Sequence, residues 1–290
     1  MIRRTLFLGL LALSLSAAAV PASAQLLAAK DGPIVYGHHH IYTANVDAQK
    51  KFFVEGLGGK VVKIGTNNQE VVEFPNVLVF FAGMRTPTGG TTGTTMNHIG
   101  FSAPDLRPVI DHIKAAGFKM TTRAELPATI EVKDDIAALN ANASIAFAMG
   151  PEDLKVELVQ VKAQTEPIKM HHLHFAGQQN KEMMEWYVKT FGAKARTAAP
   201  NATTFGADLP GVALSFAGSA TPVVGTQGRV LDHIGFEVKD LEAFTKKLEA
   251  EGIKLERPYT KVAALNIAIA FIKDPWGTYI ELTEGLDKVP

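Results

Sequence analysis

The stretch MNHIGFSAPDL, residues 96–106, has a near copy in LDHIGFEVKDL, residues 231–241, which lies 135 residues further along the chain. Self-similarity of this kind is sought first because it fixes the structural unit. The same offset aligns Phe81-Ala82-Gly83 with Phe216-Ala217-Gly218. The two halves of the chain are therefore repeats of one another.

The repeat also locates an insertion. Beyond Gly117 the offset falls to 124, so that GPEDLKVELVQ, residues 150–160, aligns with DPWGTYIELTE, residues 274–284. The first half therefore carries an 11-residue insertion between residues 118 and 146.

Each half is itself double. Four segments begin with a histidine-bearing, strand-like stretch: HHHIYTA from His38, HIGFSAP from His98, HLHFAGQ from His172 and HIGFEVK from His233. Each leads into a stretch with apolar residues at helical spacing that ends in glycine: AQKKFFVEGLG, LRPVIDHIKAAG, KEMMEWYVKTFG and LEAFTKKLEAEG. Apolar or alternating runs follow and predict strands: VLVFFAG, SIAFAMG, VALSFAG and IAIAFIK. The predicted unit is strand, helix and about three strands, used four times.

Composition limits the classes of function. The chain has 290 residues, 47% of them hydrophobic, which is enough for about two domains. Its 29 basic and 29 acidic residues cancel, and no long basic stripe indicates a nucleic-acid partner. The absence of cysteine excludes disulfides, thiolate metal sites and a cysteine nucleophile.

The N-terminus has the pattern of an export signal. Arg3 and Arg4 precede an apolar run from Thr5 to Val20, and a small-x-small site ends at Ala24. The run has 16 residues and contains serines, which is short for a membrane span. We expect a signal peptide at residues 1–24 and a soluble periplasmic or secreted mature chain.

The modular pattern resembles a known family. The openings His98 to Asp105 and His233 to Asp240, and the closing Asp274-Pro275-Trp276-Gly277 with Glu281, are similar to the vicinal oxygen chelate superfamily, which includes glyoxalase I, fosfomycin-resistance proteins, extradiol dioxygenases and metal-free bleomycin-resistance proteins. The resemblance covers about residues 34–286. It implies an α+β fold of four βαβββ modules, in which each pair of modules forms a curved, mostly antiparallel sheet around a cleft with flanking helices.

The resemblance also implies metal ligands on the first and last strands of the modules. The residues at those positions are His38, His98, His172, His233, Glu157 and Glu281. Two imidazoles and one carboxylate on neighbouring strands form a facial triad with open coordination positions, which suits Fe(II) and is also usable by zinc. The expected cofactor is a divalent ion, Fe²⁺, Mn²⁺ or Zn²⁺.

We expect the modules to pair within each half, giving one domain at residues 34–163 and a second at residues 168–286. His172, His233 and Glu281 would then bind one metal ion, whereas a role for His38 in place of His172 would mean that the modules cross over. This C-terminal site is favoured because Lys155 shares a strand face with Glu157, about 7 Å away, where its ammonium would repel a dication.

Strand alternation adds candidate catalytic residues. His40 shares a face with His38, and His174 shares one with His172, so both are candidate bases or substrate donors; the alternative is a solvated histidine at the rim. Tyr279 shares a face with Glu281 and is expected to contact substrate. The neighbouring His39 and His171 are expected to point away.

At the matching positions of the other two modules stand Gly100 and Gly235. The missing side chains leave room for a ligand, or only for a tight sheet.

Within the family resemblance, two reactions are disfavoured. The strands VLVFFAG and VALSFAG carry no carboxylate, so the four-ligand site of glyoxalase I is not expected. The stretch LNIAIAF, residues 265–271, lacks the acid-base histidine and tyrosine of extradiol dioxygenases, and Phe271 occupies the tyrosine position.

The remaining expectation is an exported metal-dependent lyase, isomerase or oxygenase that acts on a small molecule with adjacent oxygens. The alternative is a metal-free module that sequesters a small hydrophobic ligand. The expected partner is a small-molecule substrate, with no nucleic acid and no membrane after signal cleavage, and a homodimer is left open.

Overall fold

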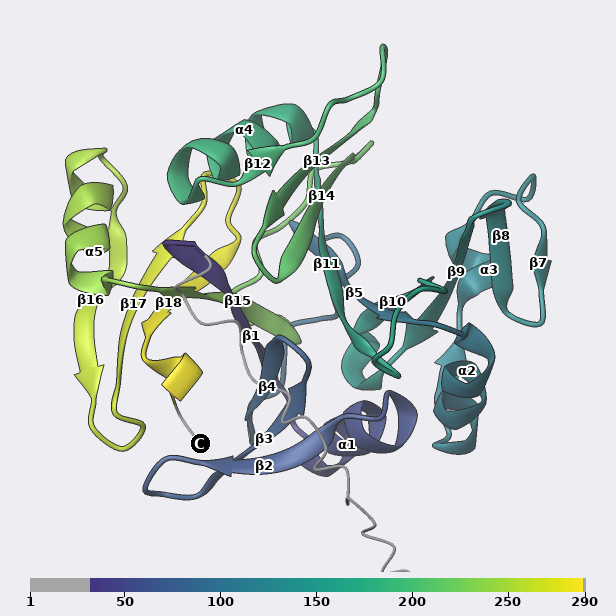
Figure 1. The fold of residues 1–290 in the computed structure, drawn as a ribbon, viewed down its shortest axis with the longest axis horizontal. Coiled ribbons are helices and arrows are strands. Elements are labelled where there is room, and N and C mark those ends of the chain that lie inside the picture. Colours follow the sequence, from purple (N-terminus) through teal and green to yellow (C-terminus); the bar gives the residue numbers. More distant parts are fainter. Residues whose placement is uncertain (1–31, 289–290) are drawn as a thin grey trace, which may run out of the picture.

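The computed structural model describes residues 32–288, so the expected signal peptide lies outside the described residues. The fold is α+β with two mixed sheets (Figure 1). No helix in this part of the chain is both long and apolar enough to cross a membrane. The elements are, in order, β1 (Ile34–Tyr42), α1 (Val46–Lys51), the π-helix η2 (Phe52–Gly56), β2 (Lys60–Ile64), β3 (Gln69–Phe74), β4 (Val77–Ala82), β5 (Met96–Ala103), α2 (Leu106–Ala115), β6 (Lys119–Met120), α3 (Thr122–Glu125), β7 (Val132–Lys133), β8 (Ile136–Asn140), β9 (Ala143–Met149), the 3-10 turn η3 (Pro151–Asp153), β10 (Lys155–Gln160), β11 (Lys169–Gly177), α4 (Asn180–Phe191), β12 (Lys194–Ala195), β13 (Thr204–Leu209), β14 (Val212–Gly218), β15 (Leu231–Val238), α5 (Leu241–Ala250), β16 (Leu255–Val262), β17 (Ile267–Lys273), β18 (Tyr279–Glu284) and the 3-10 turn η4 (Leu286–Lys288).

The four predicted modules are confirmed. They begin at β1, β5, β11 and β15, and each continues into a helix and then into strands. The aspartates of the two opening motifs start helices, because the side chains of Asp105 and Asp240 accept hydrogen bonds from the backbone N–H groups of Arg107 and Ala243. Helix α4 ends at Gly192, whose φ of 71° is the left-handed conformation that glycine adopts without strain.

The predicted insertion is also confirmed. The second module carries three extra short elements, β6, α3 and β7, between its helix and strand β8. Strand β6 pairs with β9, and the hydroxyl of Thr122 at the start of α3 accepts a hydrogen bond from the backbone N–H of Phe147 in β9. The insertion is therefore bound to the edge of the sheet rather than extending away from it.

The prediction that modules pair within each half is wrong. The eight-stranded sheet has the order β16-β17-β18-β15-β1-β4-β3-β2 and so joins module four to module one. The ten-stranded sheet joins module three to module two through the antiparallel pair β11 and β5. The boundary between residues 163 and 168 therefore does not separate the two sheets.

Two crossing segments explain this arrangement. Residues 83–95 run from β4 to β5, and residues 219–230 run from β14 to β15, so each passes from one sheet to the other. The segments are hydrogen-bonded to each other, because Val230 N donates to Gly89 O at 3.0 Å and Thr95 N donates to Val224 O at 2.9 Å. This mutual pairing satisfies backbone groups that would otherwise be buried without partners.

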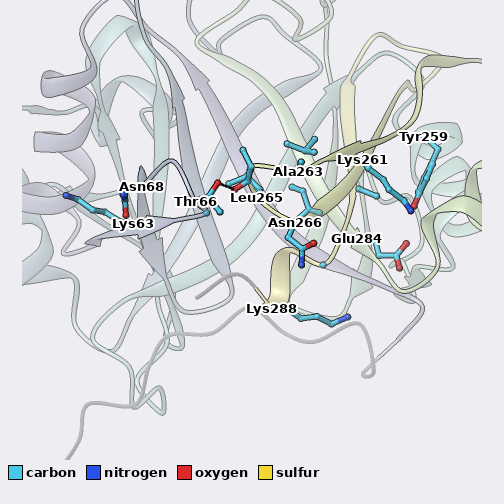
Figure 2. A pocket seen from close by; sticks show the side chains of 16 residues that line it. Lys63, Thr66, Asn68, Tyr259, Lys261, Ala263, Leu265, Asn266, Glu284 and Lys288 are labelled. Atoms are coloured by element: carbon cyan, nitrogen blue, oxygen red, sulfur yellow. Dashed lines mark hydrogen bonds between the residues drawn. The ribbon is translucent and has the colours of Figure 1, made fainter.

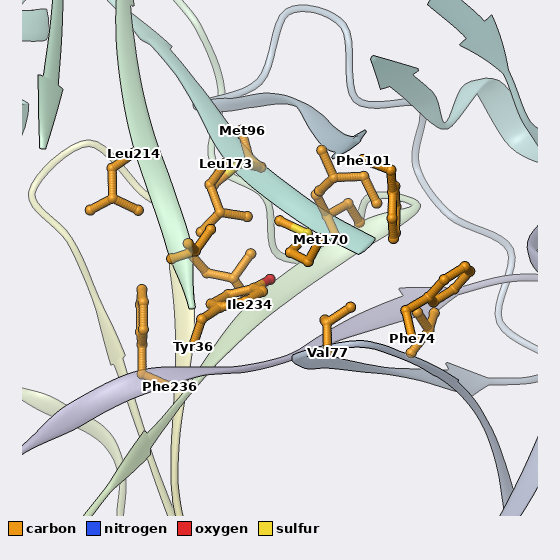
Figure 3. Close-up of a cluster of buried hydrophobic side chains, with 14 of the residues drawn as sticks. Tyr36, Phe74, Val77, Met96, Phe101, Met170, Leu173, Leu214, Ile234 and Phe236 are labelled. Atoms are coloured by element: carbon orange, nitrogen blue, oxygen red, sulfur yellow. The ribbon is translucent and has the colours of Figure 1, made fainter. Parts of the chain in front are cut away.

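The main hydrophobic core lies between the two sheets (Figure 3). It joins Tyr36 and Phe236 of one sheet to Phe101 and Leu173 of the other. The His39 ring also lies in this core, as strand alternation predicts, and its Nδ1 is 2.5 Å from the Tyr36 hydroxyl. Because these side chains occupy one face of each central strand, the opposite faces remain for the histidine clusters.

Candidate metal centres

Two clusters of histidine and glutamate lie on the central strands, one in each sheet. Centre A consists of His38, His40, His233 and Glu281, and centre B consists of His98, His172, His174 and Glu157. In each centre, one nitrogen or carboxylate oxygen from every residue lies within 4.8 Å of all the others. The structure thus brings together all six predicted ligands and both candidate bases, divided between two sites.

The predicted triad of His172, His233 and Glu281 is wrong, because His172 belongs to centre B. Glu281 instead lies between His233 of its own module and His38 of module one, with Oε2 at 3.0 Å and 2.9 Å from the two Nε2 atoms. Because module one and not module three pairs with module four, His38 takes the place predicted for His172.

The two glycines of the opening motifs make these approaches possible. Gly235 faces His38 across the β1–β15 pair, and Gly100 faces His172 across the β11–β5 pair. A Cβ atom at Gly235 would overlap the His38 ring, and one at Gly100 would overlap the His172 ring. A histidine of the partner module therefore fills the space that each glycine leaves. Both earlier interpretations of the glycines, room for a ligand and tight sheet packing, are wrong.

Hydrogen bonding in centre A leaves acceptor atoms facing each other. His233 Nδ1 is 2.6 Å from Asp232 Oδ1, and a carboxylate can only accept, so Nδ1 carries the proton. In a neutral ring, Nε2 is then a lone pair, yet it faces Glu281 Oε2. A proton between the two atoms, or a cation bound by both, removes this repulsion. Asp232 was not among the predicted site residues, although its position directly before His233 in LDHIG was a usable signal.

Centre B has a similar geometry but different outer partners. Glu157 Oε2 is 2.7 Å from His98 Nε2 and 3.2 Å from His172 Nε2, and these two nitrogens are 3.3 Å apart. His98 Nδ1 contacts Asn97 Oδ1 at 2.9 Å, and His172 Nδ1 contacts His171 Nδ1 at 2.8 Å.

The prediction that His171 points away is wrong. A register shift between Met170 and His172 in the β11–β5 pair interrupts the simple alternation of side chains. The His171 ring therefore lies against His172 and serves as its outer partner.

In each centre, the distances between ligand atoms fit a single metal ion bound by all of them. Ligand atoms about 2.1 Å from one ion lie roughly 3–3.5 Å from each other. The three pairs of ligand atoms quoted for centre B, and the two for centre A, span 2.7–3.3 Å. His38 Nδ1 is buried without a hydrogen-bond partner, which leaves Nε2 as the nitrogen aimed into centre A.

Charge outweighs burial in setting the pKa values of Glu281 and His233 in centre A. Burial alone would raise the pKa of Glu281, but His38 and His233 outweigh it and hold the pKa well below its usual range. Burial lowers the pKa of His233, but its hydrogen bonds to the Asp232 and Glu281 carboxylates outweigh burial, so the pKa is raised. The carboxylate is therefore ionised, as a ligand must be.

His40 and His174 stack on the ligand histidines. The ring centroids of His40 and His233 are 4.5 Å apart, and those of His174 and His98 are 4.2 Å apart. Burial, together with His98 and His172, lowers the pKa of His174 to about 3. The imidazole is therefore neutral at physiological pH, which is the form that coordinates metal.

His40 and His174 thus offer a fourth donor in each centre, a role that was not predicted for them. The last strands β4 and β14 carry no carboxylate, and Phe80 and Ser215 pair with His40 and His174 there. The fourth metal-binding side chain is instead His40 on β1 or His174 on β11, within reach of the other three. Each set of four therefore contains three histidines and one glutamate, and it differs from the glyoxalase I set with a second carboxylate, which was not expected.

Tyr279 lies beside centre A without entering its cavity. Its ring stacks on Phe271 at 5.0 Å and meets His233 edge-on at 5.6 Å. Burial, followed by the charge of Asp232, raises the pKa of Tyr279 to about 12, so the phenol stays protonated.

Lys155 does share the face of Glu157, as predicted, but its ammonium is neutralised. Its Nζ is 2.9 Å from Glu125 Oε2 in the inserted helix α3, and Lys155 is only 4% exposed. The repulsion that was expected to disfavour the site with Glu157 is therefore compensated within the protein.

A cavity of about 140 Å³ opens onto centre A, where His38, His40 and Glu281 form part of its wall. A larger open groove of about 1020 Å³ adjoins it and shares Val262, Leu265 and Ile267 with it (Figure 2). The groove gives a route from the surface toward the cavity.

Comparisons with known proteins agree with this architecture. Residues 147–282 match the family described as the Glyoxalase/Bleomycin resistance protein/Dioxygenase superfamily. Glyoxalase I from Zea mays is 18% identical with a TM-score of 0.65, and the match covers 88% of this chain and 94% of that chain. A putative dioxygenase from Bacillus subtilis is 10% identical with a TM-score of 0.65, covering 86% and 84%. No curated protein matches the sequence. At these identities the structural likeness shows the fold alone.

Proposed function

Because the chain belongs to the Glyoxalase/Bleomycin resistance protein/Dioxygenase superfamily, we propose that it is a divalent-metal-dependent enzyme that acts on a small molecule through two adjacent oxygens. The reaction is of the lyase, isomerase or oxygenase type. Fe²⁺, Mn²⁺ and Zn²⁺ all accept the imidazole and carboxylate donors that the two centres present.

The observation that carries this proposal is that two hydrogen-bond acceptors, His233 Nε2 and Glu281 Oε2, face each other in centre A. Asp232 fixes one proton of His233 on Nδ1, so in the neutral ring the Nε2 lone pair and Glu281 Oε2 point at one place. A carboxylate behind a metal-bound histidine is the usual outer partner that sets the tautomer and raises the basicity of the ligand. Such an arrangement fits a cation better than it fits a purely structural cluster.

Each centre would bind one ion through two histidines and one glutamate. His38, His233 and Glu281 would hold the ion in centre A, and His98, His172 and Glu157 would hold it in centre B. When bound, a divalent ion polarises substrate oxygens as a Lewis acid. His40 and His174 either complete the donor set or contact the substrate, and Tyr279 supports His233 from the side.

A second candidate function is a metal-free module that sequesters a small hydrophobic ligand. The cavity beside centre A favours it, because six of the residues that line it are apolar. Under this alternative, His233 would carry two protons and form a buried ion pair with Glu281.

Elemental analysis of the untagged protein decides between the two. We expect up to two equivalents of divalent metal in the wild type and about one fewer in Glu281→Gln, because the change removes the anionic ligand of centre A and leaves only neutral imidazoles to compete with water. Glu242→Gln, a change on the exposed face of α5, is the matched control and should retain wild-type metal content. A wild type that takes up no metal after dialysis against Zn²⁺, Mn²⁺ or anaerobic Fe²⁺ would favour the sequestering module.

We also propose that the mature chain is exported to the periplasm and begins near Gln25, on the basis of the basic start, the short apolar run and the small residues before Gln25. N-terminal sequencing of the protein from a periplasmic fraction tests this. Met1 at the start of the mature protein would contradict it.

A further inference from the structure

A buried threonine stands seven residues before one ligand histidine in each half of the chain. Thr91 precedes His98 and Thr226 precedes His233, in two stretches that share the pattern Thr-x-Gly-x-x-x-x-His. Both threonines lie in the crossing segments, and each is 1% exposed. A buried hydroxyl needs a hydrogen-bonding partner, and in both halves that partner lies on the strand that carries the ligand glutamate.

The Thr226 hydroxyl lies between two strands that carry ligands of centre A. Its Oγ1 accepts a hydrogen bond from the backbone N–H of Tyr279 at 2.9 Å and donates one to the backbone O of Asp232 at 2.7 Å. The regular ladder between β15 and β18 begins just beyond these residues, at Ile234 and Ile280. The hydroxyl therefore bridges the two strands at the end where their own hydrogen bonds have not begun.

The same stretch also fixes Asp232, the outer partner of His233. The backbone O of Asp232 accepts the hydrogen bond from Thr226, and its Oδ2 accepts one from the backbone N–H of Gly228 at 2.5 Å. Its Oδ1 remains for His233 Nδ1, at 2.6 Å. The Thr-x-Gly pair thus holds both the main chain and the side chain of the residue that sets the proton on His233.

The equivalent hydroxyl in centre B has one of these two contacts. Thr91 Oγ1 accepts a hydrogen bond from the backbone N–H of Lys155 at 3.1 Å, at the start of the strand that carries Glu157. Among residues 32–288, the Thr91 hydroxyl makes no hydrogen bond to Asn97, which occupies the position of Asp232 in the repeat. The contact to the glutamate strand is therefore common to both centres, and the second contact belongs to centre A.

We infer that Thr226 is a positioning residue for centre A. Its hydroxyl holds the strand of Glu281 against the residue that precedes His233, so that Glu281 Oε2 and His233 Nε2 meet 3.0 Å apart. The inference rests on the proposed function, because these are the atoms that would bind the ion. Without the hydroxyl, a backbone N–H and a backbone carbonyl lose their partner, and the two strand ends must move to find others.

The variant Thr226→Val tests the inference, because valine keeps the volume of the side chain and removes the hydroxyl. It is made in the Glu157→Gln protein, so that Zn²⁺ binding, measured by competition with a chromophoric chelator, reports centre A. We expect the affinity for Zn²⁺ to fall about 10- to 100-fold, the usual effect of losing a group that orients metal ligands. Thr226→Ser keeps the hydroxyl and should bind Zn²⁺ almost as tightly as the parent protein.

The matched control is Thr245→Val. Thr245 is 3% exposed, and its hydroxyl donates to the backbone O of Glu242 at 2.9 Å within α5. This variant also loses one buried hydroxyl, but it should keep the Zn²⁺ affinity of the parent protein. A Thr226→Val protein that binds Zn²⁺ like the control, or a Thr226→Ser protein that binds as weakly as Thr226→Val, would overturn the inference.

The metal-free protein gives a second readout that does not depend on the ion. The His233 Nδ1–H held by Asp232 has its own proton NMR signal, which Thr226→Val should shift or remove and Thr245→Val should leave in place. A wild-type protein that binds no Zn²⁺ would overturn the proposed function. An Nδ1–H signal that Thr226→Val leaves in place would then overturn the positioning role as well.

Discussion

Asp232 and Asn97 precede equivalent histidines in the two centres, but they impose different states on the imidazole. The Asp232 carboxylate can only accept a hydrogen bond, so the proton of His233 is fixed on Nδ1. The Asn97 amide can accept or donate, and so it fixes the tautomer of His98 less strictly. A carboxylate partner also makes the imidazole a stronger donor to metal. The two centres should therefore differ in affinity even though their ligand sets are alike.

Exchanging these two residues tests the difference. Asp232→Asn should weaken divalent metal binding at centre A about 10- to 100-fold, the usual effect of removing an outer partner, while Asn97→Asp should strengthen binding at centre B. Competition with a chromophoric chelator measures both constants, and circular dichroism checks the fold. Equal affinities in the wild type and the Asp232→Asn variant would show that Asp232 serves only the turn at Gly228, whose N–H it accepts.

Sequence patterns located the ligand residues but not these partners. His38, His98, His172 and His233 stand at repeated strand positions, which a single chain displays. Gly235, in contrast, acquires its meaning only from the His38 ring that lies over it, and that contact depends on which strand pairs with β15. The role of a residue that depends on a neighbour in the adjacent strand cannot be predicted until it is known which strands pair.

At the scale of elements, the insertion of β6, α3 and β7 supports centre B. It supplies Glu125, whose carboxylate lies 2.9 Å from the Lys155 ammonium on the strand that also carries Glu157. The equivalent strand β18 has Tyr279 in place of Lys155 and needs no such partner. The sequence located the insertion by its change of repeat offset, but it contained no signal for the ion pair, which joins residues 30 positions apart.

Breaking this ion pair should affect both stability and metal binding. Glu125→Gln leaves the buried ammonium of Lys155 with no opposite charge, and we expect a loss of about 1–3 kcal/mol in the free energy of unfolding together with weaker metal binding at centre B only. Urea denaturation and metal titration measure the two effects. Lys155→Met added to Glu125→Gln should recover most of the stability, since it removes the unpaired charge.

The matched control for this pair is Glu70→Gln, which breaks the exposed contact with Lys50. Exposed ion pairs contribute about 0–1 kcal/mol, so this variant should be close to the wild type. A Glu125→Gln protein as stable as the control, with unchanged metal binding at centre B, would contradict the role given to the insertion.

At the scale of the whole molecule, the modules are exchanged between the two halves of the chain. The fold class and the four modules follow from the repeat and its periodicity, because each module carries its own strand and helix pattern. Which modules share a sheet does not follow from the sequence. Each glutamate lies in the same module as one ligand histidine under either arrangement, and the buried faces of the strands are equally apolar in both. The crossing segments that decide it, residues 83–95 and 219–230, carry no hydrophobic periodicity and are held by backbone hydrogen bonds to each other.

Metal stoichiometry in double variants tests the exchange directly. If His38 and Glu281 serve one ion, then His38→Ala, Glu281→Gln and the variant with both changes should each lose the same single equivalent of metal. Combining His172→Ala with Glu281→Gln should instead lose two equivalents, because His172 and Glu281 belong to different centres. Pairing within each half predicts the reverse, with His172→Ala adding nothing to Glu281→Gln and His38→Ala removing a second ion. Elemental analysis of the four purified proteins, each checked for a native circular dichroism spectrum, distinguishes the two arrangements because they differ by a whole equivalent of metal.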